Sequence, residues 1–290
     1  MLHYEGTIWR PPSEAGSLIV QATIGCAYNQ CTFCTMYKDK KFRIRSVGEI
    51  KQDIAYAGKT YGRQIRKLFL ADGDALSMST KDLLSVIAYA KEQMPWLISI
   101  SSYGTALDVI HKGENQLKKL KEAGLSMVYM GAESGDETIL KEVRKGITKQ
   151  QLIEAGKLLK QAGIFNSLTL ISGLGGRKLL KEHAINSAYL ISEIKPEYLG
   201  FLTLMIEEEA VLYKKIKAGE MELLHPEDVM EEMRLFLEHV DSEGTVFRSN
   251  HASNYVMLKG TLNKDRDLML AQVKKAEEDC LFRRENHRRL

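Results

Sequence analysis

Short apolar segments of strand length alternate with longer amphipathic segments along most of this chain. The apolar segments are rich in branched residues, which favour buried strands. They cover residues 18–24, 68–71, 97–101, 127–130, 168–171 and 199–204. Because a strand followed by a helical crossover returns in the same direction, this alternation predicts parallel strands in an α/β fold.

Four sequence patterns mark where helices begin. Three have the spacing of a capping box, in which a hydroxyl side chain and an acidic or amide side chain three residues later bond each other's backbone N–H. These pairs are Ser79 with Asp82, Ser134 with Glu137, and Thr148 with Gln151. Pro226 suits the first position of a further helix, where its missing N–H removes no helical hydrogen bond.

Six strand and helix units are fewer than the eight of a closed (β/α)8 barrel. We therefore expect an open, incomplete (β/α)6 TIM-like barrel over residues 17–205. Residues 1–16 form an N-terminal extension in this interpretation, and residues 206–290 form a mainly helical C-terminal extension that closes or flanks the barrel. In parallel α/β folds, ligands bind at the carboxyl ends of the strands.

The composition favours a globular protein that stays away from membranes. The chain has 290 residues, 44% of them hydrophobic, and a net charge of +3 that does not demand a polyanionic partner. No apolar run approaches the roughly 20 residues of a membrane span, and the N-terminus lacks a signal pattern. We expect a cytoplasmic protein without a membrane partner. Clustered cysteines, unlike the spread set of a disulfide scaffold, also favour a reducing compartment.

Three of the four cysteines, Cys26, Cys31 and Cys34, lie within nine residues directly after the first predicted strand. Thiolates this close commonly share a metal centre. A cubane iron–sulfur cluster has four irons, so three protein thiolates leave one iron open to another ligand. The sequence therefore predicts a metal site at the carboxyl edge of the sheet.

This cysteine loop, its position after the first strand and the strand–helix alternation resemble the radical S-adenosylmethionine (radical SAM) superfamily. The resemblance implies a [4Fe-4S] cluster held by the three cysteines, whose open iron binds S-adenosylmethionine (SAM). It also implies an aromatic residue before the last cysteine, and Phe33 stands there. The usual spacing is three residues and then two, whereas this chain has four and then two, an atypical Cx4Cx2C loop.

Further segments at predicted strand ends resemble SAM-binding segments of that family. Asp72, Gly73 and Asp74 stand where the family commonly has Gly-Gly-Glu beside the methionine amino group; an acidic turn is the alternative. The resemblance assigns Glu133 and Ser134 to the ribose or carboxylate of SAM, although Ser134 also fits a helix cap. It assigns Gly173 to support of the adenine, with close backbone packing as the alternative.

The resemblance implies that SAM is cleaved reductively to a 5′-deoxyadenosyl radical, which abstracts hydrogen from an unreactive carbon of an unidentified substrate. We expect that substrate to be small and polar. The electron would come from a one-electron reductant such as flavodoxin or ferredoxin. Cys280 alone is insufficient for a second cluster, and we expect it to be a buried small apolar residue. The resemblance thus implies a short, single-cluster enzyme, and the residues name no further catalytic group.

A dense polar run after the sixth predicted strand is the candidate substrate site. Its donors and acceptors suit a polar small molecule, although Asn and Ser also stabilise turns and a single His is often structural. The candidate substrate residues are Arg248, Asn250, His251, Asn254 and Tyr255.

Other functions compete with this interpretation. The basic segment 283–289 keeps open a radical SAM enzyme that modifies tRNA or another RNA, although a frayed helical end is the simpler explanation and RNA is not favoured. A structural or regulatory protein could hold zinc with the three cysteines and His251. Plain electron transfer would usually use four cysteines. Arg43 and Arg45 are expected to be solvated surface charges.

Overall fold

The structure is a computed structural model that describes residues 1–289. Its internal contacts divide the chain into two compact units, each discontinuous in sequence. Unit 1 consists of Met1–Asn29, Met36–Met130 and Lys157–Asn166. Unit 2 consists of Gln30–Thr35, Gly131–Gly156 and the residues from Ser167 onward.

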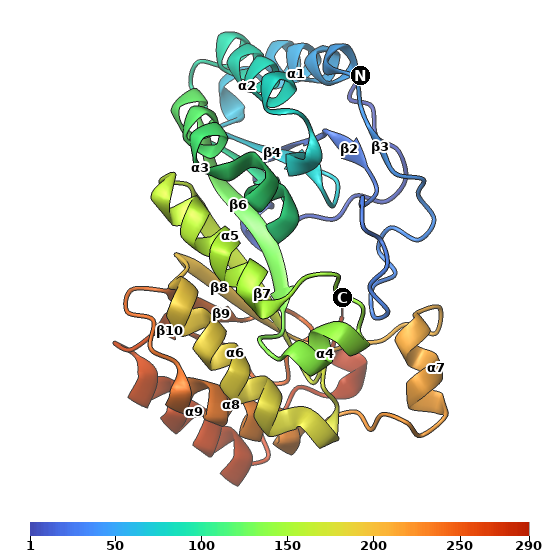
Figure 1. Ribbon diagram of the computed structural model, residues 1–290, viewed down its shortest axis with the longest axis vertical. Helices are drawn as coiled ribbons and strands as arrows, with labels where there is room; N and C mark the ends of the chain where they lie inside the picture. Colours follow the sequence, from blue (N-terminus) through green and yellow to red (C-terminus); the bar gives the residue numbers. More distant parts are fainter. Residues whose placement is uncertain (290) are drawn as a thin grey trace. The chain divides into compact units, whose positions relative to one another are not determined.

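Unit 1 is built on parallel strands with helices packed against them (Figure 1). Its strands are β1 (Leu18–Gln21), β2 (Thr23–Ile24), β3 (Arg43–Ile44), β4 (Lys67–Ala71), β5 (Ser99–Tyr103) and most of β6 (Leu125–Glu133). Its helices are α1 (Val47–Tyr61), α2 (Thr80–Gln93) and α3 (Ala106–Ala123), with 3-10 turns at Pro12–Glu14, Gly62–Gln64 and Ala75–Ser77. Helix α2 packs between α1 and α3.

The core of unit 1 is a set of aromatic rings on neighbouring strands. Phe69 of β4 contacts the ring of Tyr103 edge-on, with the centroids 5.0 Å apart, and also packs on Tyr129. The N-terminal segment reaches this core through buried Glu14, which accepts hydrogen bonds from Ser101 and from the Tyr129 hydroxyl. A buried carboxylate requires such partners, so these bonds anchor the segment against β5 and β6.

Unit 2 has a parallel sheet that ends in one antiparallel pair. Its strands are β7 (Phe165–Ser172, from Ser167 on), β8 (Tyr198–Thr203), β9 (Val246–Ser249) and β10 (Leu258–Thr261). Its helices are α4 (Glu137–Glu142), α5 (Lys149–Gln161, up to Gly156), α6 (Leu180–Ile194), α7 (Val211–Lys217), α8 (Pro226–His239) and α9 (Arg266–Glu278), with 3-10 turns at Arg177–Leu179 and Glu285–His287.

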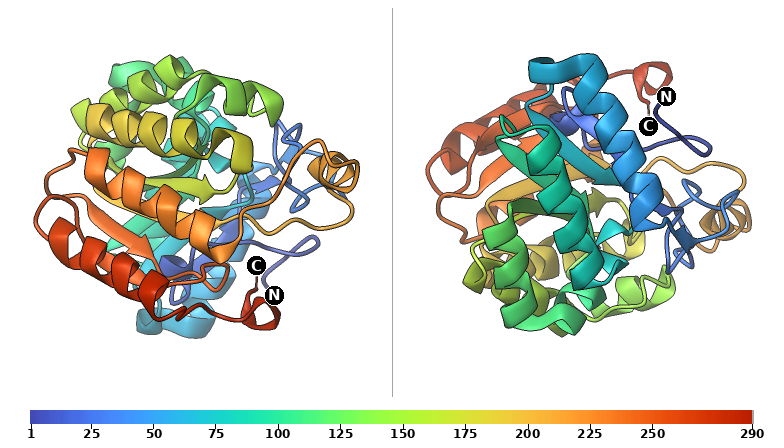
Figure 2. Two further views of the ribbon diagram at one scale, coloured as in Figure 1. Left: turned by 90° about the horizontal axis from the view of Figure 1, so that it is seen from below. Right: turned by 90° about the horizontal axis from the view of Figure 1, so that it is seen from above.

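Helices α6, α8 and α9 lie side by side against the strands of unit 2 (Figures 1 and 2). The contact is apolar: Phe236 of α8 packs on Phe201 of β8 with the ring centroids 5.0 Å apart, and on Phe247 of β9. All three rings are buried. Buried residues alternate with less buried ones along β7, β8 and β9, so the side chains packed against these helices form the more buried face of the sheet.

The fold class predicted from the sequence is confirmed. All six predicted segments contain a strand, and the first of them contains two, β1 and β2. The strand order is β1-β4-β5-β6 in unit 1 and β7-β8-β9-β10 in unit 2. The pairs β1/β4, β4/β5, β5/β6, β7/β8 and β8/β9 are parallel, and β9/β10 is antiparallel. Neither unit closes into a barrel by itself within the described residues. Strands β9 and β10 had not been identified from the sequence.

Three of the four predicted helix starts are confirmed and one is wrong. Ser79 caps α2, Thr148 and Gln151 form the reciprocal bonds before α5, and Pro226 is the first residue of α8. Helix α4 is capped by Asp136 instead of Ser134, because the carboxylate of Asp136 accepts from two backbone N–H groups of the first turn.

Two expectations about exposure are also wrong. Arg45 is buried, since it forms an ion pair of 2.7 Å with Asp53 of α1 and donates to the Gln21 carbonyl. Cys280 is exposed, because it follows the end of α9 with a positive φ of 51° that turns the chain away from the helix. Arg43 is solvated, as expected.

None of the helices within residues 1–289 combines the length and apolar character that crossing a membrane requires.

Candidate cofactor and substrate site

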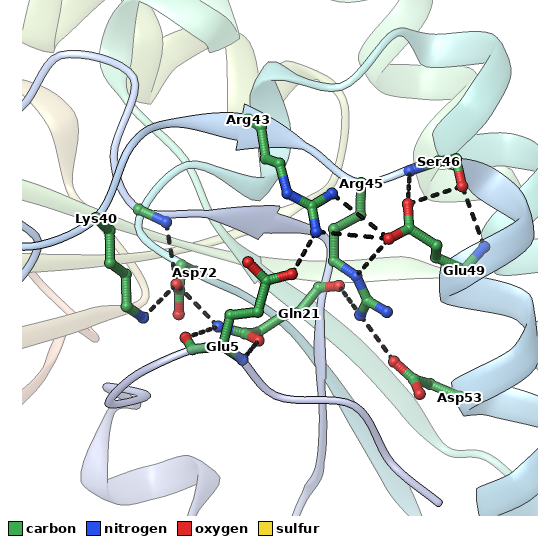
Figure 3. A network of polar contacts seen from close by, with 10 residues as sticks. Glu5, Gln21, Lys40, Arg43, Arg45, Ser46, Glu49, Asp53 and Asp72 are labelled. Carbon is green, nitrogen blue, oxygen red and sulfur yellow. Dashed lines mark hydrogen bonds and ion pairs between the residues drawn. The ribbon is translucent and has the colours of Figure 1, made fainter.

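Asp72, directly after β4, is fully buried and bonded to the start of the cysteine loop (Figure 3). Its Oδ2 accepts from Lys40 Nζ at 2.7 Å, from Gln21 Nε2 at 3.0 Å and from Gly25 N at 3.1 Å. Its Oδ1 is buried without a hydrogen-bond partner among the described residues. One carboxylate oxygen of Asp72 is therefore committed to holding the loop against the end of β4.

Gly73 lies where no other residue fits. A Cβ built on Gly73 would come within 2.5 Å of the Tyr37 ring and 3.2 Å of the Cys26 Cβ. Such close approach is possible only without a side chain. The backbone after β4 therefore lies directly against the first cysteine of the loop.

Asp74, the next acidic residue, is only 2% exposed. Burial and then a hydrogen bond and charge from Asp108 raise the pKa of Asp74 to about 9, whereas the charge of Lys112 acts in the opposite direction. Its Oδ1 is buried and has no hydrogen-bond partner among the described residues. Near neutral pH this carboxyl is therefore protonated, and one of its oxygens is left to an external donor.

Phe33 and its neighbour anchor the second part of the cysteine loop within unit 2. Thr32 N donates to the Val143 carbonyl at 2.9 Å, and the Thr32 carbonyl accepts from Leu212 N at 2.8 Å. Phe33 packs on an apolar cluster that includes Val143, Leu174 and Leu212. These contacts fix the backbone just before Phe33 and place its side chain on the apolar cluster.

The three cysteines are half-buried and divided between the units, with Cys26 in unit 1 and Cys31 and Cys34 in unit 2. Within residues 1–289, the structure contains no preformed group of three or more His, Cys, Asp or Glu side chains around a metal position.

Glu133 ends β6 in the left-handed conformation, with a φ of 67°. Its carboxylate forms an ion pair of 2.9 Å with Lys145. A Cβ on Gly131 would lie 2.0 Å from Glu133 Oε1, so a larger residue there would displace this carboxylate. The backbone turn and the ion pair together fix the direction of the Glu133 side chain.

Ser134 belongs to a buried polar network in unit 2. Its hydroxyl lies 2.8 Å from His183 Nδ1, and His183 Nε2 lies 3.0 Å from the Ile171 carbonyl and 3.7 Å from Glu232. A carbonyl only accepts, so His183 Nε2 carries a hydrogen and donates it to the Ile171 carbonyl. His183 therefore links the segment after β6 to the end of β7.

Gly173 follows β7 with a φ of 81° and donates its N–H to both carboxylate oxygens of Glu232, at 3.1 and 3.3 Å. Glu232 comes from α8 and is fully buried. Burial raises its pKa, while His183, Ser172 and the Gly173 N–H act against that shift. Helix α8 thus holds the backbone of Gly173 through a buried carboxyl group.

A cavity of about 570 Å³ opens at the carboxyl ends of β7 and β8 in unit 2. Its wall combines backbone and polar groups of the strand ends with apolar side chains and four polar residues from the C-terminal part of the chain. Those four are Tyr255, Glu285, Arg288 and Arg289. The Arg288 guanidinium is buried, stacks on the Tyr255 ring at 4.1 Å and donates to the Leu204 and Ser253 carbonyls.

Of the predicted substrate residues, only Tyr255 is among the residues lining this cavity. Arg248 is exposed on β9 and Asn250 is exposed just after it. The buried Asn254 bonds the Thr203 hydroxyl and the Phe201 carbonyl. His251 bonds Ser253, and burial together with the charge of Arg283 lowers the pKa of His251. The predicted substrate segment therefore contributes only Tyr255 to the cavity wall, and Asn254 holds strand β8 in place.

Sequence reasoning missed several residues because their partners are distant along the chain. They are Asp108, Lys112, His183, Glu232, Glu285 and Arg288. Only Asp108 carried a local signal: it stands three residues after Thr105 and completes the capping box of α3. Nothing in the neighbouring residues of His183 or Glu232 indicated their burial.

Among curated proteins, the chain is similar to an uncharacterized methyltransferase of Pyrococcus horikoshii, with 30% identity over 151 residues, covering 50% of this chain and 30% of the relative. It is also similar to the heme chaperone HemW of Bacillus subtilis, with 22% identity over 188 residues, covering 64% of this chain and 49% of the relative. The chain thus spans a third to a half of the length of these relatives.

Solved structures share the fold at low identity. Methylornithine synthase (PylB) superposes with a TM-score of 0.53 at 18% identity, covering 91% of this chain and 81% of that one. The radical SAM methyltransferase TsrM of Kitasatospora setae gives 0.58 at 17% identity, covering 70% and 40%. The sequence profile of the radical SAM superfamily matches residues 20–186, which is more than half of the chain and includes the whole cysteine loop. The chain therefore belongs to the radical SAM superfamily.

Proposed function

We propose that this chain is a single-cluster radical SAM enzyme that acts on a small polar substrate. The cofactors of the superfamily are a [4Fe-4S] cluster and SAM. The observation that carries the proposal is the loop of Cys26, Cys31 and Cys34 within the matched region, because three thiolates leave one iron open for SAM. The fourth cysteine, Cys280, is exposed after α9, and a single cysteine cannot hold a second cluster.

Two features of unit 1 fit bound SAM. The backbone at Gly73 is bare and lies against Cys26, so a ligand on the cluster can approach it closely. Asp74 has a buried oxygen without a partner among the described residues, which suits the methionine ammonium group. The Gly73 backbone and the Asp74 side chain would hold the methionine part of SAM. We assign the remaining contacts with SAM to Phe33, Glu133, Ser134 and Gly173.

When bound, the reduced cluster and SAM supply a 5′-deoxyadenosyl radical that abstracts a hydrogen atom from an unreactive carbon. The residues of the chain orient SAM and the substrate and keep water away. Glu232 and His183 fix the strand ends that carry Gly173 and Ser134. A radical SAM enzyme also needs a one-electron reductant, and we propose flavodoxin or ferredoxin for that part.

The cavity of unit 2 supports a small substrate. Its volume of about 570 Å³ lies within the range of small-molecule sites. Tyr255 and Glu285 offer a hydroxyl and a carboxylate at one wall, and apolar residues such as Leu204 and Leu224 line the other part. A small molecule with a polar end and an apolar body matches these groups.

The test is anaerobic reconstitution with iron and sulfide, followed by dithionite and SAM. We expect about four irons per chain and formation of 5′-deoxyadenosine. Cys31→Ala should abolish both the full iron content and the product. Cys280→Ala is the matched control and should behave like the unsubstituted protein, because Cys280 is exposed at the end of α9. Zinc in place of iron, or full activity of Cys31→Ala, would contradict the proposal.

Modification of tRNA is the second candidate, favoured by the names of further relatives. The chain is 26% identical over 125 residues to a tRNA uridine(34) acetyltransferase of Methanocaldococcus jannaschii, covering 41% of this chain and 22% of the relative. The matched part is small in both chains. Binding of tRNA, treated in the Discussion, separates the two candidates.

A further inference from the structure

The C-terminal segment 283–289 forms part of the wall of the cavity in unit 2. The residues of this segment that line the cavity are Glu285, Arg288 and Arg289. Bonds to a turn after β9 fix the segment, since Arg283 Nη1 donates to the His251 and Ala252 carbonyls at 3.1 and 2.7 Å. Both partners belong to unit 2, so this wall is built within one compact unit.

Glu285 is a carboxylate that is held in place while its side chain stays accessible. Its Oε1 accepts from Arg288 Nη1 at 2.5 Å, and its Oε2 accepts from the Tyr255 hydroxyl at 2.9 Å. The Glu285 side chain is nevertheless 71% exposed. Partial burial acts to raise the pKa of Glu285, but the bonds from Arg288 and Tyr255 outweigh it and lower the pKa. A carboxylate has about four lone-pair sites, so an ionised Glu285 keeps acceptor sites for a ligand.

The polar neighbours of Glu285 have committed their hydrogens. The Tyr255 hydroxyl donates its hydrogen to Glu285. Arg288 is buried, and each nitrogen of its guanidinium donates to a group of the protein. Its acceptors are the Ser253 and Leu204 carbonyls, the Tyr255 hydroxyl and Glu285. The wall around Glu285 therefore offers a ligand acceptors in preference to donors.

The remaining polar side chains of the lining agree with this preference. Glu207 is a second carboxylate and accepts from the Thr35 hydroxyl. The Thr203 hydroxyl donates to Asn254 at 2.9 Å. Arg289 is exposed, and a carboxylate ligand would have to pair with it beside two carboxylates of the wall. An ammonium group only donates, so it complements these acceptors.

We propose that Glu285 binds an ammonium group of the substrate in the cavity of unit 2, and that Arg288 and Tyr255 are positioning residues that hold its carboxylate. This inference rests on the proposed function and names its substrate class, a primary amine with an apolar body. The N–H groups of the ammonium donate to free lone pairs of Glu285, and no covalent bond changes. Leu204 and Leu224 of the lining contact the apolar body.

Three probes that share one apolar chain test the end group: hexylamine, hexanol and hexanoate. Each is titrated anaerobically into the reconstituted holoenzyme at pH 7 without reductant, and saturation-transfer NMR follows binding. We expect hexylamine, which is protonated like lysine, to bind about tenfold more tightly than the other two, because it alone forms a charge-assisted bond. Equal binding of the three probes, tighter binding of hexanoate, or no binding at all would overturn the inference.

Glu285→Gln removes the charge and keeps an oxygen that can accept from Tyr255 or Arg288. Hexylamine affinity should fall by about tenfold, while hexanol affinity stays unchanged. Glu278→Gln is the matched control, because Glu278 is a 63% exposed carboxylate at the end of α9 that pairs with Lys274 at 3.7 Å. It should change neither affinity, and an equal loss in the control would overturn the role of Glu285. Where Glu285→Gln fails to fold, the three probes on the unsubstituted protein decide.

Tyr255→Phe tests a positioning residue. It keeps the ring that stacks on Arg288 at 4.1 Å and removes the hydroxyl that donates to Glu285. Hexylamine affinity should fall by about three- to tenfold with hexanol affinity unchanged. Equal losses for both probes would limit Tyr255 to shaping the cavity and overturn its positioning role.

SAM also carries an ammonium group, so it is the decisive competitor. Hexylamine should bind with the same affinity with and without saturating SAM. Displacement by SAM would assign the cavity to SAM and overturn the inference. Absence of 5′-deoxyadenosine after reduction would instead overturn the proposed function, because the preference for hexylamine needs no radical chemistry and is measured separately.

Discussion

Two cations that follow the cysteine loop, Lys40 and Arg43, stand three residues apart but differ in burial (Figure 3). Lys40 is 5% exposed and its partner Asp72 is 0% exposed. Arg43 and its partner Glu5 are 41% and 37% exposed. Because removing one member of a buried pair leaves an uncompensated charge, while an exposed pair is screened by water, the two residues should differ strongly in their contribution to stability.

We predict that Lys40→Met lowers the free energy of unfolding by about 3–5 kcal/mol, because buried Asp72 keeps its charge without the ammonium. Arg43→Met should lower it by less than about 1 kcal/mol. Urea unfolding followed by circular dichroism measures both. If both variants lost a similar free energy of unfolding, burial would not determine how much each ion pair contributes to stability.

At the scale of elements, helices α6 and α8 hold the strand ends of unit 2 through single buried side chains. His183 of α6 links Ser134 to the Ile171 carbonyl, and Glu232 of α8 binds the N–H of Gly173. No other hydrogen bond satisfies that N–H among the described residues. The conformation of the segments after β6 and β7 thus depends on two helices that are distant in sequence.

Glu232→Ala should therefore lower the free energy of unfolding by about 1–3 kcal/mol, since the buried Gly173 N–H loses its acceptor. Glu238→Ala, on the same helix but 38% exposed and paired only with Arg234, should stay within about 0.5 kcal/mol of the unsubstituted protein. Urea titration of both variants gives the comparison. A loss for Glu238→Ala as large as that for Glu232→Ala would refute the role of the buried network.

The secondary-structure elements that the sequence predicts correctly are those with local signals. Periodicity and caps are local, so six strands and the starts of α2, α5 and α8 follow from neighbouring residues. The predicted cap at Ser134 is wrong because Asp136, two residues later, also fits an N-cap position. In the folded chain Asp136 caps α4, and the Ser134 hydroxyl contacts the distant His183. Strands β9 and β10 have four residues each and lie beside polar turns, so no alternation marks them.

For the candidate site, the sequence indicated the segments that follow strands but not the groups that act on them. Gly73 and Asp74 stand in a recognisable segment, whereas Asp108 and Lys112 come from the next helix and meet Asp74 only in the folded chain. Arg45 was placed on the surface because its partner Asp53 lies two helical turns further on. Burial and long-range pairing are properties of packing, and local pattern does not contain them.

Across the whole molecule, the positive charge is small and part of the basic C-terminal segment is used internally. The net charge is +3. Arg283 donates to the His251 and Ala252 carbonyls, and buried Arg288 donates to Leu204 and Ser253, so the segment is neither a frayed helix nor wholly available to RNA. Arg284 and Arg289 are the arginines of this segment that stay exposed.

This distribution predicts weak, unspecific binding of tRNA. We expect a dissociation constant on the order of 10⁻⁴–10⁻⁶ M at physiological salt, because few phosphate contacts are available and counterion release scales with their number. Fluorescence anisotropy with labelled tRNA over 50–200 mM salt, about the range in which such contacts are lost, measures affinity and slope together. The double variant Arg284→Ala, Arg289→Ala should lower the affinity for tRNA little more than replacement of two exposed lysines by alanine elsewhere on the surface does. Tight binding that falls steeply with salt and is lost in the double variant would instead favour modification of tRNA, because the exposed arginines would then be reading a phosphate backbone.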